Sequence, residues 1–359
     1  MPVHLRRIAV VLGLALGVLM LAPISASSQT APDPSLGIAH KQPVFGGACK
    51  SCPWGAMGEA VKAALAPYGY DVQICYNCFR ADAPRIVGDA RMPPPWNPHM
   101  GEGAFPDSYV PPPPNAPVEF GATADQLLVA AYDGTGPYAR DGPRHQLRLL
   151  ANIDSPVFLL VAVRKGAGIR DLAQLKDHVG PLKVVADGEM SDVVFDYYGT
   201  SAAALKAKGA VFVPEFDPVQ RRDADLIIQW GTLVNAPEFN VWYQASQQQD
   251  LDYLQLPEPL LARLSRELKM ERRDIPVGLL RGLDQPIHSV ARTGTVVYGR
   301  ADMPEDFAYL VAKALDEQQD VFEWSQQRFN YDPHRVAIAG DVPLHPGAAR
   351  YYRERGVIH

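Results

Sequence analysis

The chain has 359 residues, of which 47% are hydrophobic and 21% are charged, and its formal net charge is −6. This composition is that of an ordinary globular protein with one large or two medium-sized domains. The acidic balance, with a pI near 5.9, argues against a nucleic-acid-binding protein, which carries a basic patch or stripe.

The N-terminus has the pattern of an export signal. Two arginines precede an apolar run, Ile8–Ala22, and small residues around Ala26 supply a cleavage site. The run is shorter than a membrane-spanning helix requires, and no later stretch approaches that length. We therefore expect residues 1–26 to be a cleaved signal peptide and 27–42 to be a flexible leader.

All four cysteines follow this signal, in the two CxxC pairs Cys49/Cys52 and Cys75/Cys78. An exported protein reaches an oxidising compartment, where thiols become disulfides, so we predict two structural disulfides. Four cysteines allow three pairings, and the sequence does not choose among them. The alternatives are a zinc or iron–sulfur site held by four thiolates and a redox-active CxxC.

Strand and helix patterns alternate along the chain from residue 43 to about 319. This alternation predicts parallel strands joined by right-handed crossovers. It fits a two-lobed α/β protein in which each lobe is an open sheet with a ligand crevice at the carboxyl ends of its strands. The expected strands are 43–45, 70–75, 118–120, 158–164, 182–186, 211–216, 225–230 and 295–299, and the expected helices are 54–65, 81–87, 124–132, 169–176, 192–198, 257–268 and 304–319.

A proline-rich stretch, 91–116, interrupts the alternation. Its two proline runs favour extended backbone and exclude a helix or a central strand. We predict an inserted surface loop that acts as a lid or a partner-docking arm through Trp96 and Phe105. A soft-metal site is the alternative interpretation, although the spacing imposes no coordination geometry; its ligands would be Met92, His99 and Met100.

Two further patterns have a functional and a structural interpretation each. The segment from Gly188 to Asp192 starts a predicted helix, so its free N–H groups suit an anion, but Ser191 or Asp192 equally suits an N-cap. Trp54 and Trp230 follow or end strands and are candidates to sandwich a ligand, yet core packing is common for tryptophan. No catalytic motif is present in the sequence.

The C-terminal tail, Val342–Ile358, reads VPLHPGAARYYRERGVI and resembles the end of the TAXI family, the extracytoplasmic solute-binding proteins of tripartite TRAP transporters. Within the tail we expect a structural role for His345. Other segments are similar to the family in the same order, and the resemblance spans about residues 43–358. These segments are 147–153 with 157–164, 168–176, 275–278 and 300–304.

The resemblance implies a type II periplasmic-binding-protein-like α/β fold. Its two lobes are each an open, mainly parallel sheet flanked by helices, and two hinge strands near 156–164 and 291–299 join them. The implied boundaries are 43–160 for the first part of lobe 1, which includes the proline-rich insert, 161–292 for lobe 2, and 293–359 for the return to lobe 1 and the C-terminal helices.

The resemblance also implies a function. It predicts a monomeric periplasmic protein without enzymatic activity, cofactor or metal, which captures a small organic acid or similar molecule by hinge closure and delivers it to TRAP-type membrane subunits. The alternatives are an exported metal or redox protein that uses the CxxC pairs and a ligand-binding protein that signals to a membrane sensor. The predicted ligand-site residues are Gly47, Ala48, Cys49, Trp54, Thr123, Gly188, Ser191, Asp192, Trp230, Gly231 and Thr232.

The sequence departs from the family pattern where the ligand is expected. Trp54 and Gly55 take the positions of paired tyrosines, the Thr/Gly-rich end of the second strand becomes Cys75–Cys78, and the proline-rich stretch is inserted into a normally continuous segment. The fold therefore carries over more directly than the acid ligand does.

Overall fold

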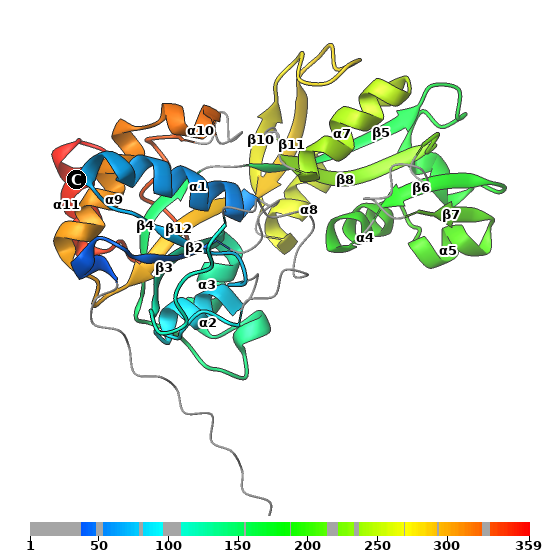
Figure 1. The fold of residues 1–359 in the computed structure, drawn as a ribbon. Coiled ribbons are helices and arrows are strands. Elements are labelled where there is room, and N and C mark those ends of the chain that lie inside the picture. The colour runs from blue at the N-terminus through cyan, green and yellow to red at the C-terminus, as the bar shows by residue number, and fades with distance from the viewer. Residues whose placement is uncertain are drawn as a thin grey trace, which may run out of the picture. The chain divides into compact units, whose positions relative to one another are not determined.

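The computed structural model, drawn in Figure 1, describes most of the chain after residue 36. The predicted signal peptide, Cys49 and Cys52, and the insert residues Trp96, His99, Met100 and Phe105 lie outside the described residues. The described residues are 37–47, 53–78, 82–95, 109–153, 156–186, 188–213, 222–232, 237–268, 270–292, 294–324 and 331–359.

The first sheet has five strands in the order β2-β1-β3-β12-β4. The pairs β1–β2 and β1–β3 are parallel, whereas β12 runs antiparallel to both β3 and β4. The strands are β1 (Val44–Gly46), β2 (Gln73–Cys75), β3 (Val118–Ala124), β4 (Leu147–Ile153) and β12 (Thr295–Arg300).

Helices cover both faces of this sheet (Figure 1). They are α1 (Pro53–Leu65), α2 (Asp82–Gly88), α3 (Asp125–Asp133), α9 (Glu305–Glu317), α10 (Asp320–Trp324) and α11 (Pro346–Glu354). Successive side chains of a strand point to opposite faces. Phe45 therefore packs in the cluster that includes α1 and α9 residues, whereas its neighbour Val44 packs in the cluster that includes α2 and α3 residues.

The second sheet has the order β10-β11-β5-β8-β6-β7, and β9 also pairs with β5. Only β8–β6 and β6–β7 are parallel pairs. Its strands are β5 (Val157–Arg164), β6 (Leu182–Ala186), β7 (Ala210–Phe212), β8 (Leu226–Thr232), β9 (Leu251–Tyr253), β10 (Glu271–Ile275) and β11 (Ile287–Arg292), and the helices of this part are α4 (Gly188–Tyr197), α5 (Ala202–Ala207), α7 (Pro237–Gln248) and α8 (Glu258–Leu268). Short 3-10 turns occur at Ile38–His40, Ala66–Tyr68, Gly136–Tyr138 and Leu172–Lys176.

The predicted mixed α/β fold with two sheets is confirmed, with one correction. Parallel pairing of the described strands is confined to β2-β1-β3 and β8-β6-β7. The expectation of mainly parallel sheets is therefore wrong for the second sheet, in which four of the six described strand pairs are antiparallel. Parallel neighbours need a long crossover; β10 and β11 are instead consecutive strands, and β12 enters the first sheet on the chain's return from the second. The chain passes between the sheets twice, after β4 and after β11.

The C-terminal tail packs closely against α9, and this packing accounts for His345 and Gly347 in its sequence. His345 is fully buried and caps α11, because its Nδ1 accepts a hydrogen bond of 3.2 Å from the Gly347 N–H. A Cβ atom on Gly347 would lie 2.0 Å from the carbonyl oxygen of Glu305, at the start of α9. Only glycine allows α11 to approach α9 this closely, and the structural role expected for His345 is confirmed.

Candidate functional site

The carboxyl ends of the parallel strands β1, β2 and β3 meet at one edge of the first sheet. Gly46 is in register with Cys75 on one side and with Gly121 on the other. A Cβ atom on Gly121 would lie 2.8 Å from the Gly46 carbonyl oxygen, so the backbones approach closely here. Open α/β sheets bind ligands beyond the carboxyl ends of their parallel strands, which makes this edge the first place to look for a site.

A disulfide closes the turn that follows β2. It joins Cys75 and Cys78, whose Cα atoms lie 5.5 Å apart, and the Cys78 N–H donates to the Cys75 carbonyl at 3.4 Å. This confirms the predicted disulfide for the second CxxC pair and selects the pairing within that motif. The two sulfurs are bonded to each other and are therefore not thiolate ligands for a metal.

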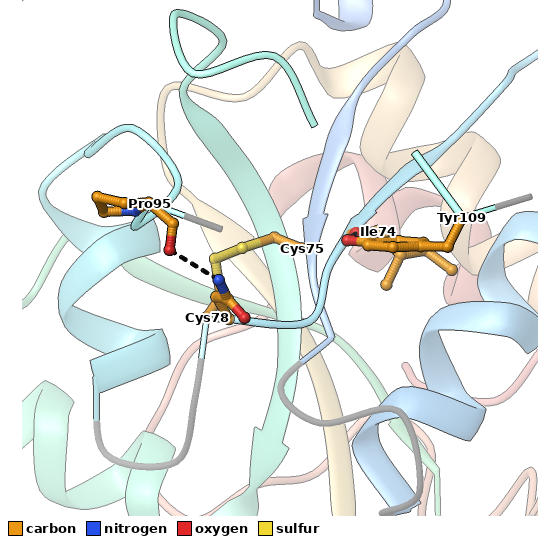
Figure 2. The surroundings of a disulfide bond; sticks show 6 residues. Ile74, Cys75, Cys78, Pro95 and Tyr109 are labelled. Atoms are coloured by element: carbon orange, nitrogen blue, oxygen red, sulfur yellow. Dashed lines mark hydrogen bonds between the residues drawn. A yellow bond between two sulfur atoms is a disulfide. The ribbon is translucent and has the colours of Figure 1, made fainter. Parts of the chain in front are cut away.

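Two hydrogen bonds join the described parts of the proline-rich stretch, residues 91–95 and 109–116, to the turn and to the end of β2 (Figure 2). The Asn77 Nδ2 donates to the Pro95 carbonyl at 2.8 Å, and the Tyr109 hydroxyl donates to the Ile74 carbonyl at 2.9 Å. Figure 2 shows Pro95 and Tyr109 on either side of the disulfide. The two described parts of the insert are thus tied to the end of β2 and to its turn, a contact that only the folded chain reveals.

A cavity of about 240 Å³ lies between the turn and the insert. Six of its lining residues are prolines, two are tyrosines, and no lysine, arginine or histidine lines it among the described residues. The lining residues are Cys75, Tyr76, Asn77, Pro93, Pro94, Pro95, Tyr109, Pro111, Pro112 and Pro114.

Both tyrosines of the cavity are neutral and hold their hydroxyl protons in internal hydrogen bonds. Burial, together with the hydrogen bond that the Tyr76 hydroxyl donates to Glu59, raises the pKa of Tyr76 well above its usual value. Burial also raises the pKa of Tyr109 to about 12. Their rings contact each other, with centroids 5.1 Å apart, and they form a rigid aromatic wall.

The predicted ligand residues of the first sheet fall at or near this edge. The Gly47 N–H donates to the Cys75 carbonyl at 3.2 Å, which links the ends of β1 and β2. Thr123 lies in β3 with its side chain buried. Trp54 belongs to α1, but its side chain lies outside the described residues, as do Ala48 and Cys49. Whether these residues contact a ligand stays a prediction.

The predicted residues of the second sheet lie at the start of α4 and at the end of β8. Gly188 and Ser191 do not precede the helix; both lie within α4, and the Ser191 hydroxyl donates to the Gly188 carbonyl at 2.8 Å. Asp192 is exposed on the same helix. The N-cap interpretation of Ser191 and Asp192 is therefore wrong, because the helix begins four residues earlier than expected.

In β8, Trp230 is half-buried and packs against the hydrophobic cluster of the second sheet, as its structural interpretation predicts. Gly231 is buried, and the Thr232 side chain lies outside the described residues. A ligand contact by these three residues, and a sandwich with Trp54, stay predictions.

Asn77 and Tyr109 are the site residues that sequence reasoning missed. Asn77 stood in the CxxC motif as a spacer, and Tyr109 stood in a stretch interpreted as a surface arm. The sequence held one indication of this contact. The proline runs come soon enough after the second strand to lie against the end of that strand.

Comparisons with known proteins give a family match and a set of similar solved structures. The sequence model of the NMT1-like family matches residues 115–356. Similar solved structures include MatC (Rpa3494) from Rhodopseudomonas palustris with bound malate, at 14% identity and a TM-score of 0.41 over 89% of this chain and 98% of that one. A TctC solute binding protein from Polaromonas gives 12% identity and 0.41 over 88% and 98%. The periplasmic aliphatic sulphonate binding protein SsuA from Escherichia coli gives 12% and 0.36 over 87% and 78%.

Across the described part of the chain, every helix is too short or too polar to serve as a membrane span.

Proposed function

Because the chain belongs to the NMT1-like family, we propose that it is an exported solute-binding protein, which captures a small molecule outside the cytoplasm and passes it to a membrane transporter. The observation that carries the proposal is the pair of chain crossings between two separate α/β sheets, after β4 and after β11. Two crossings leave each sheet free to act as the core of a lobe, and hinge closure around a ligand is the motion that such a linkage permits.

In this proposal the lobes follow the predicted boundaries, except that β5 lies whole in the second sheet, so the first boundary falls before residue 157. The first lobe combines residues 43–156 with 293–359, and the second is 157–292. Ligand binds between them, near the carboxyl ends of β1, β2 and β3. The proposed hinge strands, near 156–164 and 291–299, lie where the chain passes between the two sheets, after β4 and after β11.

The proposed partner is a TRAP-type transporter, on the strength of the resemblance of the tail to the TAXI family. Membrane vesicles that contain TRAP-type membrane subunits test the assignment. Uptake of solute that depends on the purified protein supports it. Binding to a membrane sensor kinase, with no uptake, would replace it with a signalling role.

Solution scattering and thermal unfolding test the binding function directly. A bound solute stabilises only the folded state, so the melting temperature rises with ligand concentration, and closure makes the particle more compact. The screen contains carboxylates, amino acids and small aromatic compounds. If no member of the screen changes either observable, the binding function in this form is wrong.

The alternative of a metal protein loses support from Cys75 and Cys78, because a disulfide supplies no thiolate. A redox-active CxxC forms the same disulfide when it is oxidised, so the disulfide does not count against that alternative. Elemental analysis of the purified protein tests the metal alternative. Stoichiometric zinc or iron would favour the metal protein over the solute-binding protein.

A further inference from the structure

The cavity beside β2 offers hydrogen-bond acceptors and few donors. A proline residue contributes a backbone carbonyl but no N–H, and six of the ten lining residues are prolines. Cys75 and Cys78 are joined in the disulfide, so neither has an S–H group that could donate a hydrogen bond. The hydroxyl protons of Tyr76 and Tyr109 are already donated to Glu59 and to the Ile74 carbonyl.

Asn77 adds an acceptor that has no partner. Its side chain is only 4% exposed, and its amide group donates to the Pro95 carbonyl. Because a carbonyl can only accept, the NH₂ group of Asn77 must face Pro95, and this fixes the orientation of the amide. The Oδ1 atom has almost no accessible surface and no hydrogen-bond partner among the described residues, so a ligand donor reaches it only where the surrounding walls move apart. A buried acceptor in this state costs free energy that a ligand donor would recover.

The same walls disfavour an anion. A buried carboxylate needs a cation or several N–H groups to offset its desolvation, and the described lining supplies no lysine, arginine or histidine. Proline rings and the Tyr76–Tyr109 pair present flat, rigid apolar surfaces, which suit a planar ring. The volume of about 240 Å³ fits a single small ring system, since it lies below the roughly 300–1,000 Å³ of pockets for drug-sized ligands.

We propose that this cavity binds a planar apolar group that carries an N–H or O–H donor and no negative charge, with the donor on Asn77 Oδ1 and the ring against Tyr76 and Tyr109. The inference rests on the proposed solute-binding function and names its ligand class as phenols, indoles and related neutral aromatic donors. It replaces the small organic acid that the family resemblance implies.

Matched ligand pairs test the class on the mature, oxidised protein. Phenol is compared with anisole and indole with 1-methylindole, because each methyl group removes the donor and leaves the ring; benzoate is the anionic probe. Titration calorimetry or ligand-observed NMR should show phenol and indole binding roughly three- to tenfold more tightly than their methylated partners, the range expected for one hydrogen bond. Benzoate should not bind in the cavity.

A substitution at Asn77 locates the effect. Asn77→Leu keeps a similar volume and removes the acceptor together with the donor to Pro95, so it should weaken phenol and indole binding roughly three- to tenfold more than it weakens anisole binding. Asn115→Leu is the matched control, since Asn115 lies in the same proline-rich stretch but does not line the cavity. Should Asn77→Leu fail to fold, intermolecular NOEs from phenol to the Tyr76 and Tyr109 rings of the unaltered protein replace it, and their absence refutes the site.

The outcomes separate this inference from the function on which it rests. Carboxylates that raise the melting temperature and compact the protein independently of Asn77 would uphold solute binding and overturn the aromatic class. Equal affinities within each ligand pair would also overturn it. Binding of phenol and indole that depends on Asn77 but produces no closure would support the cavity and count against the hinge mechanism.

Discussion

Two regions beside the first sheet differ in whether a buried oxygen acceptor has its hydrogen-bond donors. Where α9 meets α11, Asp316 is only 6% exposed and accepts hydrogen bonds from Tyr351 at 2.5 Å, Arg355 at 2.7 Å and Tyr331 at 2.9 Å. At the end of β2, the Tyr109 hydroxyl reaches a backbone carbonyl, and Asn77 Oδ1 is left without a partner among the described residues. The first region is satisfied by its own groups and stabilises the fold; the second leaves an acceptor for a ligand.

The largest expected effect is at the helix junction. Gly347→Ala places a methyl group 2.0 Å from the Glu305 carbonyl, which is backbone and cannot turn aside. We expect the free energy of unfolding to fall by about 3 kcal/mol, the upper end for overpacking, as measured by chemical denaturation. Gly58→Ala in α1 is the control, because its new Cβ meets the side chains of Ile74 and Phe45 at 3.1–3.3 Å, which can shift. An equal loss in both variants would contradict the close-approach explanation.

The next effect concerns Asp316. Asp316→Asn removes the charge and one acceptor oxygen from a buried network, so we expect a loss of about 2–3 kcal/mol, as for a hydrogen bond to a charged group. Asp306→Asn is the control, because that carboxylate is 95% exposed and pairs only at the surface with Arg350; its unfolding midpoint should not change.

The pH dependence sharpens this prediction. Burial raises the pKa of Asp316, but hydrogen bonds from Tyr351, Arg355 and Tyr331 outweigh it and hold the pKa below its usual value. A lowered folded-state pKa adds stability that is complete above the unfolded value of about 3.9 and is lost as the pH falls through the folded value. The difference in unfolding free energy between the natural protein and Asp316→Asn should therefore shrink below about pH 4. A difference that grows in acid would contradict the assignment.

A smaller loss of stability is expected at the disulfide. The Cys75–Cys78 bridge closes a loop of only a few residues, so Cys75→Ser with Cys78→Ser should cost about 2 kcal/mol in the chain-entropy estimate. We also expect weaker phenol binding, because the turn that carries Asn77 is released.

Thiol titration under denaturing, non-reducing conditions completes this test. The natural protein should show no free thiol, which extends the disulfide prediction to Cys49 and Cys52. The double serine variant should also show none. Two reactive thiols in the variant would mean that the first CxxC pair depends on the second.

The smallest effect is expected for Tyr109→Phe, which removes the hydroxyl that donates to the Ile74 carbonyl. One hydrogen bond of this kind is worth about 1 kcal/mol, and the ring stays in the cavity wall. Tyr309→Phe is the control, because it removes an exposed hydroxyl bound to Glu354 at 2.6 Å. Its free energy of unfolding should change less than that of Tyr109→Phe. If Tyr109→Phe is more harmful to stability than Asp316→Asn, the contrast between the two regions fails.

Several features were predictable because they depend on local pattern. β6 spans Leu182–Ala186 as expected, and α1 ends at Leu65 as its helical spacing indicates. The alternation of these elements predicted two α/β sheets. The start of α4 was misplaced, since glycine and serine at Gly188 and Ser191 resemble a cap and their inclusion in the helix depends on contacts that sequence patterns do not contain.

The sequence by itself determined the class of elements, the oxidation of Cys75 and Cys78, and the structural role of His345, because periodicity, compartment and the tail motif are properties of short segments. The tertiary structure decided the rest. The antiparallel strand β12 enters the first sheet because the chain returns to it from the second sheet, which no local pattern encodes. The proline-rich stretch became the wall of a cavity only because Asn77 and Tyr109 bond to atoms 18 and 35 residues away, and such pairings follow from packing rather than from sequence.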